Sequence, residues 1–118
     1  MRTLITILIV VVAFEHFYFL ILEMFFWTKP KGIKIFGLKS KEFAEETKVL
    51  AANQGLYNGF LSAGLIWSLL IKDLNISVFF LCCVLIAGVF GAYSTKNIKL
   101  LYIQSTPAIL TMLLCVLN

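Results

Sequence analysis

The chain has 118 residues, of which 61% are hydrophobic and only 14% are charged, and its mean hydropathy is +0.98. Soluble domains are about half apolar and about a quarter charged, so this composition excludes an ordinary soluble domain and predicts a membrane protein. The net charge is +4, but the basic residues form no aromatic-interleaved face of the kind that binds nucleic acid. We therefore expect the lipid bilayer, and no nucleic acid, as a partner.

Four segments are predicted to form membrane helices, because about 20 apolar residues span a hydrocarbon core of about 30 Å and a helix satisfies its own backbone there. In chain order these helices cover about residues 3–27, 41–71, 76–95 and 98–117. The first is expected to be retained, because FYFLILEMFFW extends it and no small-residue cleavage site follows. The prediction is an all-α, polytopic four-transmembrane-helix bundle that forms a single membrane domain over residues 1–118.

A basic loop over about residues 28–40 is the one sizeable connection outside the membrane. Pro30 and Gly32 are expected to end the first helix, whereas Ser40 is a suitable N-cap for the second, with Glu42 in its first turn. The loop is expected either to lie on an anionic lipid surface through its lysines or to form a lid over a cavity.

The distribution of lysine and arginine predicts the orientation of the chain. The first and third connections hold eight of these residues, whereas the opposite side holds only Arg2 and Lys72. Because positive charge marks cytoplasmic loops, both termini are expected to face outward.

The second helix carries an unusual polar stretch, NQGLYNG, inside an apolar run. At 100° per residue, its amide and phenol side chains span about 140° of one side, which is expected to look into the bundle. These side chains are Asn53, Gln54, Tyr57 and Asn58. A stripe of Gly55, Gly59 and Ala63 is expected to allow a neighbouring helix to approach closely. Leu56, Phe60 and Trp67 gather on the remaining, lipid-facing side.

The other helices add polar groups and small residues. Glu15, His16 and Glu23 lie on the first helix, and a charge at mid-membrane costs at least about 2.5 kcal/mol, so such residues usually face the interior. We expect Glu15 to be neutral or partnered. Gly88 and Gly91 are expected to be packing positions, and Gln104 to face inward. Pro107 is expected to break or kink the last helix, with Ser105, Thr106 or water satisfying the freed carbonyl.

Depth in the membrane unites these polar residues. Most lie in the cytoplasmic half of the predicted bundle, while the outward halves (LITILIVVVAF, LIWSLLI, ISVFFLCCVLIAG and ILTMLLCVL) are almost wholly apolar. The pattern predicts a polar site open toward the cytoplasm and closed by an apolar plug. Its candidate ligand-binding residues are Glu15, His16, Glu23, Asn53, Gln54, Tyr57, Asn58 and Gln104. The alternative is a structural network in which the amides only join helices.

Metal and cofactor chemistry is not expected. The chain lacks the Glu-x-x-His spacing of di-iron bundles and the His-Glu-x-x-His zinc motif. Cys82, Cys83 and Cys115 lie in apolar stretches without a Cys-x-x-Cys pair and are interpreted as small buried hydrophobes.

Four blocks carry a family resemblance: EHFYFLILEMFFWTKP, AANQGLYNGFLSAGLIW, GAYSTKN and QSTPAIL. In these blocks, which follow one another over nearly the full length, the chain resembles the family of small bacterial integral membrane proteins catalogued as domain of unknown function 1304 (DUF1304). The resemblance implies a four-helix protein of the bacterial inner membrane. It implies no activity and no catalytic residue.

Three functions remain open. We favour a protein that binds, or helps to move, a small molecule, a lipid or a proton; transport by four helices would need a homodimer. The second hypothesis is an accessory subunit of a membrane complex. The third, and least favoured, is a cofactor-free membrane enzyme in which His16 with Glu15 or Glu23 performs acid–base chemistry on a lipid-soluble substrate.

Overall fold

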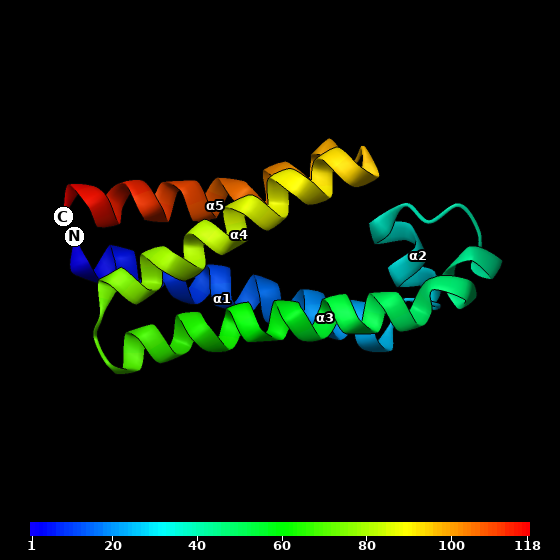
Figure 1. Ribbon diagram of the computed structural model, residues 1–118, viewed down its shortest axis with the longest axis horizontal. Coiled ribbons are helices and arrows are strands. Elements are labelled where there is room, and N and C mark those ends of the chain that lie inside the picture. The colour runs from blue at the N-terminus through cyan, green and yellow to red at the C-terminus, as the bar shows by residue number, and fades with distance from the viewer. The chain divides into compact units, whose positions relative to one another are not determined.

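The computed structural model describes residues 1–118 and consists of helices joined by short connections (Figure 1). The five helices are α1 (Arg2–Phe25), α2 (Pro30–Phe36), α3 (Lys41–Leu70), α4 (Leu74–Thr95) and α5 (Ile98–Leu117). The all-α prediction is therefore confirmed. Three helices, α1, α4 and α5, are long and apolar enough to cross a membrane. The longest helix, α3, is less apolar because its charged first turns and the NQGLYNG stretch interrupt it.

The connection between α1 and α3 contains the short helix α2, which lies inside the stretch expected to be a loop. Pro30 occupies the start of this helix, where its fixed φ is compatible with helix and its missing N–H is not needed. Gly37 ends the helix in the left-handed region, at φ 62°. Gly32 is buried, and a Cβ there would overlap the carbonyl oxygen of Phe26. This connection is thus an ordered helical turn that packs on the chain just beyond α1.

Side-chain caps begin the later helices. The predicted cap at Ser40 is confirmed, because its Oγ accepts a hydrogen bond of 3.0 Å from the N–H of Phe43. Asp73 caps α4 by accepting from the N–H of Asn75 at 2.9 Å. Asn97 caps α5 by accepting from the N–H of Leu100 at 3.4 Å. The turns before Asp73 and Asn97 each contain a lysine with positive φ: Lys72 at 58° and Lys96 at 56°.

The chain divides into two compact units, and the boundary between them falls inside both α1 and α3. Unit 1 comprises residues 1–15 and 61–118, and unit 2 comprises residues 16–60. Both chain termini lie at the same end of unit 1 (Figure 1). The core of unit 1 is wholly aliphatic and consists of Ile5, Ile9, Val12, Ala13, Leu65, Leu81, Val84 and Ala108. Two of its buried polar groups satisfy each other, since the hydroxyls of Ser68 and Ser77 lie 2.7 Å apart.

In unit 1, α4 and α5 lie side by side (Figure 1). A Cβ at Gly88 would overlap the hydroxyl of Ser105, whereas Gly91 has no other atom within 4 Å of its Cβ position. The helix α5 continues through Pro107 to Leu117, so the proline does not end it. The hydroxyl of Ser105 is buried without a hydrogen-bond partner, and it therefore does not satisfy the carbonyl that Pro107 frees.

The two glycines of α4 form a matched pair that tests this packing. Gly88→Leu is expected to lower the free energy of unfolding by about 1–3 kcal/mol, because the added side chain must displace α5. Gly91→Leu is expected to change it by less than about 0.5 kcal/mol, the usual range for a surface substitution. Unfolding by sodium dodecyl sulfate in mixed micelles measures both effects, and equal destabilisation by the two variants would contradict the assigned contact.

Candidate functional site

The carboxyl group of Glu23 is the most deeply buried acidic group of unit 2. Glu23 lies near the end of α1 and is only 1% exposed. Its Oε1 accepts a hydrogen bond of 2.5 Å from Nδ2 of Asn58 on α3. Its Oε2 is buried and has no hydrogen-bond partner. The side chain of Gln54, one turn before Asn58, also approaches this carboxyl group without bonding to Oε2. One carboxyl oxygen is therefore held by an amide, and the other has no hydrogen-bond partner.

Two glycines bring α3 against α1 at this carboxyl. A Cβ at Gly55 would lie 2.9 Å from Cγ of Met24, 3.1 Å from Cβ of Glu23 and 3.2 Å from the carbonyl oxygen of Leu20. A Cβ at Gly59 would lie 2.5 Å from Cδ1 of Leu20. Side chains at these positions would push the helices apart and break the hydrogen bond from Asn58. The Gly-xxx-Gly spacing is therefore what allows the amide to reach the acid.

The third residue of the small stripe behaves differently. Ala63 is exposed and belongs to unit 1, whereas Gly55 and Gly59 belong to unit 2. In unit 2, the close approach of α1 and α3 thus involves the two glycines and not Ala63. The exposed Ala63 leaves a small, smooth position on the surface of α3.

His16 is fully buried in unit 2, two helical turns before Glu23 on α1. Its ring meets the ring of Phe19 edge to face, with centroids 5.6 Å apart. An aromatic edge contact of this kind favours one orientation of the imidazole ring.

The remaining predicted site residues lie elsewhere. Asn53 and Tyr57 are exposed on α3, and the ring of Tyr57 lies 6.2 Å from that of Phe60. Glu15 and Gln104 belong to unit 1, where one carboxyl oxygen of Glu15 is buried without a hydrogen-bond partner. The structure of unit 2 thus brings together Glu23, Asn58 and Gln54, and it does not place Asn53 or Tyr57 with them.

A polar contact next to the site was missed by the sequence analysis. Nε1 of Trp27 donates to Oγ1 of Thr47 at 3.0 Å, and this hydroxyl donates to the carbonyl of Phe43 at 2.7 Å. The ring of Phe36 lies 5.0 Å from that of Trp27. These contacts tie α2 and the start of α3 to the chain four residues after Glu23. An indole N–H that is partly buried needs a partner, so Trp27 itself indicated that a nearby acceptor exists.

Chemically, the arrangement can hold a proton or a hydrogen-bond donor. A carboxyl group offers acceptor positions on both oxygens, and Asn58 occupies only one of the oxygens. A proton on Oε2, or a donor group from a small molecule, would complete the set. No group of three or more His, Cys, Asp or Glu side chains is placed to hold a metal ion.

Removal of the Asn58 amide tests how much its hydrogen bond to Glu23 contributes to stability. Asn58→Ala is expected to destabilise the protein by about 1.5 kcal/mol, near the upper end for membrane hydrogen bonds, because it removes the amide that donates to a buried carboxyl group. In the Glu23→Ala background the same substitution should cost much less. A double-mutant cycle with detergent unfolding measures this coupling, and additive effects of the two substitutions would show that the pair contributes no coupling energy.

Comparison with known proteins places these residues in a wider group. A family model described as "Protein of unknown function (DUF1304)" matches residues 10–116, a range that includes every candidate site residue from Glu15 to Gln104. The uncharacterized protein YpaA of Lactococcus lactis subsp. lactis (strain IL1403) is similar, with 28% identity over 116 residues that cover 96% of this chain and 97% of the relative. No solved structure is significantly similar to the chain.

Proposed function

Since the chain belongs to the DUF1304 family, whose description assigns no activity, we propose a function from the geometry of its own residues. The protein is a small integral membrane protein in which Glu23 forms an intramembrane polar site. This site binds a proton or a small molecule that carries a hydrogen-bond donor, and it is reached from the cytoplasm. The observation that carries the proposal is the buried carboxyl with one oxygen anchored by Asn58 and the other unpartnered.

A purely structural role explains this carboxyl poorly. Buried polar groups in folded proteins are nearly always hydrogen-bonded, because an unsatisfied group costs free energy. A glutamine at position 23 would accept the same hydrogen bond from Asn58 without the cost of burying an ionisable group. Ionisable residues inside membrane segments are costly and usually mark a functional position. The unpartnered Oε2 therefore supports a binding role more than a role as glue between helices.

The membrane arrangement that we propose determines the depth of Glu23 and the side from which it is reached. We place α1, α4 and α5 across the bilayer, with α3 as the fourth span, because 30 residues of helix extend about 45 Å. Its bulky residues Leu56, Phe60 and Trp67 are all at least 42% exposed, as lipid contact would require. With lysine-rich connections in the cytoplasm, both termini lie outside a bacterial inner membrane. Glu23, near the end of α1, then lies in the cytoplasmic half.

This orientation can be measured with thiol labelling. In a variant whose three native cysteines are replaced by alanine, a membrane-impermeant maleimide added to intact cells should label Asn118→Cys and leave Ser40→Cys unlabelled. Permeabilised cells should show labelling of both. The opposite pattern in intact cells would reverse the orientation and place Glu23 in the outward half.

The carboxyl itself is tested by Glu23→Gln, which keeps an acceptor for Asn58 but cannot ionise. Infrared difference spectra across a pH titration should contain the C=O band of a buried carboxylic acid, and this band should be absent in Glu23→Gln. Native mass spectrometry of gently released protein should show whether a small molecule is bound and lost in the same variant. Glu46→Gln, an exposed glutamate on α3, is the matched control and should keep both features.

Two outcomes would contradict the proposal. The first is an infrared titration of Glu23→Gln that superimposes on that of the unmodified protein. The second is the absence of bound ligand from the mass spectra of both the unmodified protein and Glu23→Gln, together with infrared spectra in which neither protein takes up a proton at position 23. Either pairing of results would move the assignment toward a structural network.

An accessory role is the second candidate, and the exposed polar face of α3 favours it. Asn53 and Tyr57 are exposed on α3, and an amide that faces lipid is costly without a partner. A second copy of this chain, or a larger subunit, would supply such a partner if its own polar side chains met Asn53 and Tyr57. Native mass spectrometry of the intact protein reports this association as well. We do not propose catalysis, because His16, the candidate acid–base group, is fully buried against Phe19.

A further inference from the structure

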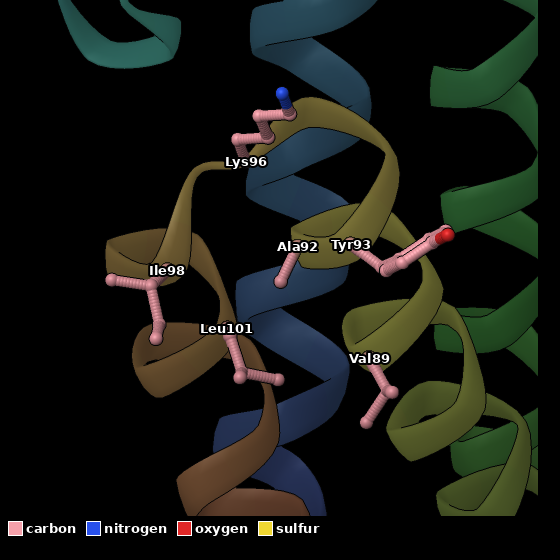
Figure 2. Close-up of a pocket in the computed structure, with 6 residues that line it drawn as sticks. All are labelled: Val89, Ala92, Tyr93, Lys96, Ile98 and Leu101. Atoms are coloured by element: carbon pink, nitrogen blue, oxygen red, sulfur yellow. The ribbon is translucent and has the colours of Figure 1, made fainter.

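An apolar groove lies between α4 and α5 beside the turn that joins them. Its volume is about 340 Å³, and its walls consist of Val89, Ala92, Tyr93, Lys96, Ile98 and Leu101. Figure 2 shows Ala92, Val89 and Leu101 between the two helices, with the ammonium group of Lys96 at the turn above them. The groove thus combines an apolar trough with one cation at its rim.

The backbone fixes the position of this cation. Lys96 is the C-cap of α4 and adopts the left-handed conformation, with φ 56° and ψ 26°. Lys99 follows in the first turn of α5, so positive charge collects at the turn and not along the trough. The negative end of the α4 dipole is offset there by the lysines and by the start of α5, whose dipole favours an anion.

The groove lies at the depth where lipid headgroups meet acyl chains. The helices α4 and α5 have 22 and 20 residues, so each extends about 30 Å, close to the thickness of the hydrocarbon core. Their connecting turn must therefore lie at a membrane surface. Tyr93 and Tyr102, which are 82% and 63% exposed, flank this turn, and exposed tyrosines are typical of the interface.

We propose that this groove binds one anionic phospholipid of the surrounding bilayer. An acyl chain lies in the trough against Val89, Ile98 and Leu101, and the phosphate lies at Lys96. The positive rim selects an anionic headgroup, because the apolar walls are common to all lipids and only the cation distinguishes between headgroups. The proposal rests on the membrane location of α4 and α5 proposed above, but it does not depend on Glu23.

The experiment uses the full chain in detergent with two lipids that share the same acyl chains, phosphatidylglycerol and phosphatidylcholine. Native mass spectrometry during a titration counts the lipids bound. Phosphatidylglycerol should bind with higher affinity, and Lys96→Gln should reduce that preference about fivefold, the effect of about 1 kcal/mol per basic residue near an anionic surface. Lys72→Gln is the matched control, because Lys72 has the same backbone conformation at the other end of α4.

A second variant tests the trough independently of charge. Ala92→Phe fills the space between the helices and should weaken binding of both lipids at the site, while circular dichroism reports whether the helices are retained. Inorganic phosphate, added as a competitor, should not displace phosphatidylglycerol, because it lacks an acyl chain.

Several results would overturn the proposal. Equal binding of the two lipids would remove the headgroup selectivity, and equal losses in Lys96→Gln and Lys72→Gln would reduce it to overall charge. Displacement by inorganic phosphate would replace the lipid site with an anion site. If the folded protein bound neither lipid, the result would count against the proposed membrane location of α4 and α5. The proposed carboxyl site would still stand if the infrared band of Glu23 titrated as described above.

Discussion

The contact of α3 with α1 across Gly55 and Gly59 is the constraint on which unit 2 depends. A hydrogen bond of 2.5 Å between Asn58 and Glu23 requires their backbones to lie closer than ordinary side chains allow. The glycines supply this distance, and the amide then anchors one oxygen of an acid that is otherwise buried among apolar groups. The order of cause is therefore packing first and electrostatics second. A larger side chain at Gly55 or Gly59 would break the hydrogen bond between Asn58 and Glu23 even if both of these residues were retained.

The two units distribute polarity very differently. The core of unit 1 is aliphatic, and the buried hydroxyls of Ser68, Ser77 and Thr111 bond to each other or to the backbone of their own helices. Unit 2 holds the buried carboxyl, the amides and the basic connection, together with the contact of Trp27 and Thr47. The helices α1 and α3 both run through the two units. Each of them therefore contributes apolar core residues in unit 1 and polar site residues in unit 2.

The sequence predicted the helical class, the cap at Ser40 and the apolar character of three spans, because composition, capping and length each have a local physical cause. It did not predict helix α2, since Pro30 and Gly32 are equally compatible with a helix end and with the start and buried face of a new turn. The small stripe on α3 could be identified from spacing, but spacing alone did not show that Ala63 would be exposed while Gly55 and Gly59 contact α1.

The site shows the same limit. An arc of about 140° gathered four polar residues into one predicted face. In the structure only Asn58 bonds to Glu23, with Gln54 nearby, because a crossing helix covers a much narrower strip than such an arc. Asn53 and Tyr57 lie in one half of the arc and Gln54 and Asn58 in the other, and only the second half meets Glu23. The partner of Trp27 depended on where α2 turns the chain, and no local pattern encodes that path.

The short turn between α4 and α5 has a consequence for how the protein enters a membrane during its synthesis. Only Lys96 and Asn97 separate the two helices, so neither can be inserted while the other remains in water. In the membrane arrangement proposed above, the pair would enter the bilayer together, with its charged tip on the cytoplasmic side. The lysines at the tip would then act as a brake during biogenesis. In that arrangement, translocation would stop where the first cations meet the hydrocarbon, and this would determine the final depth of both helices.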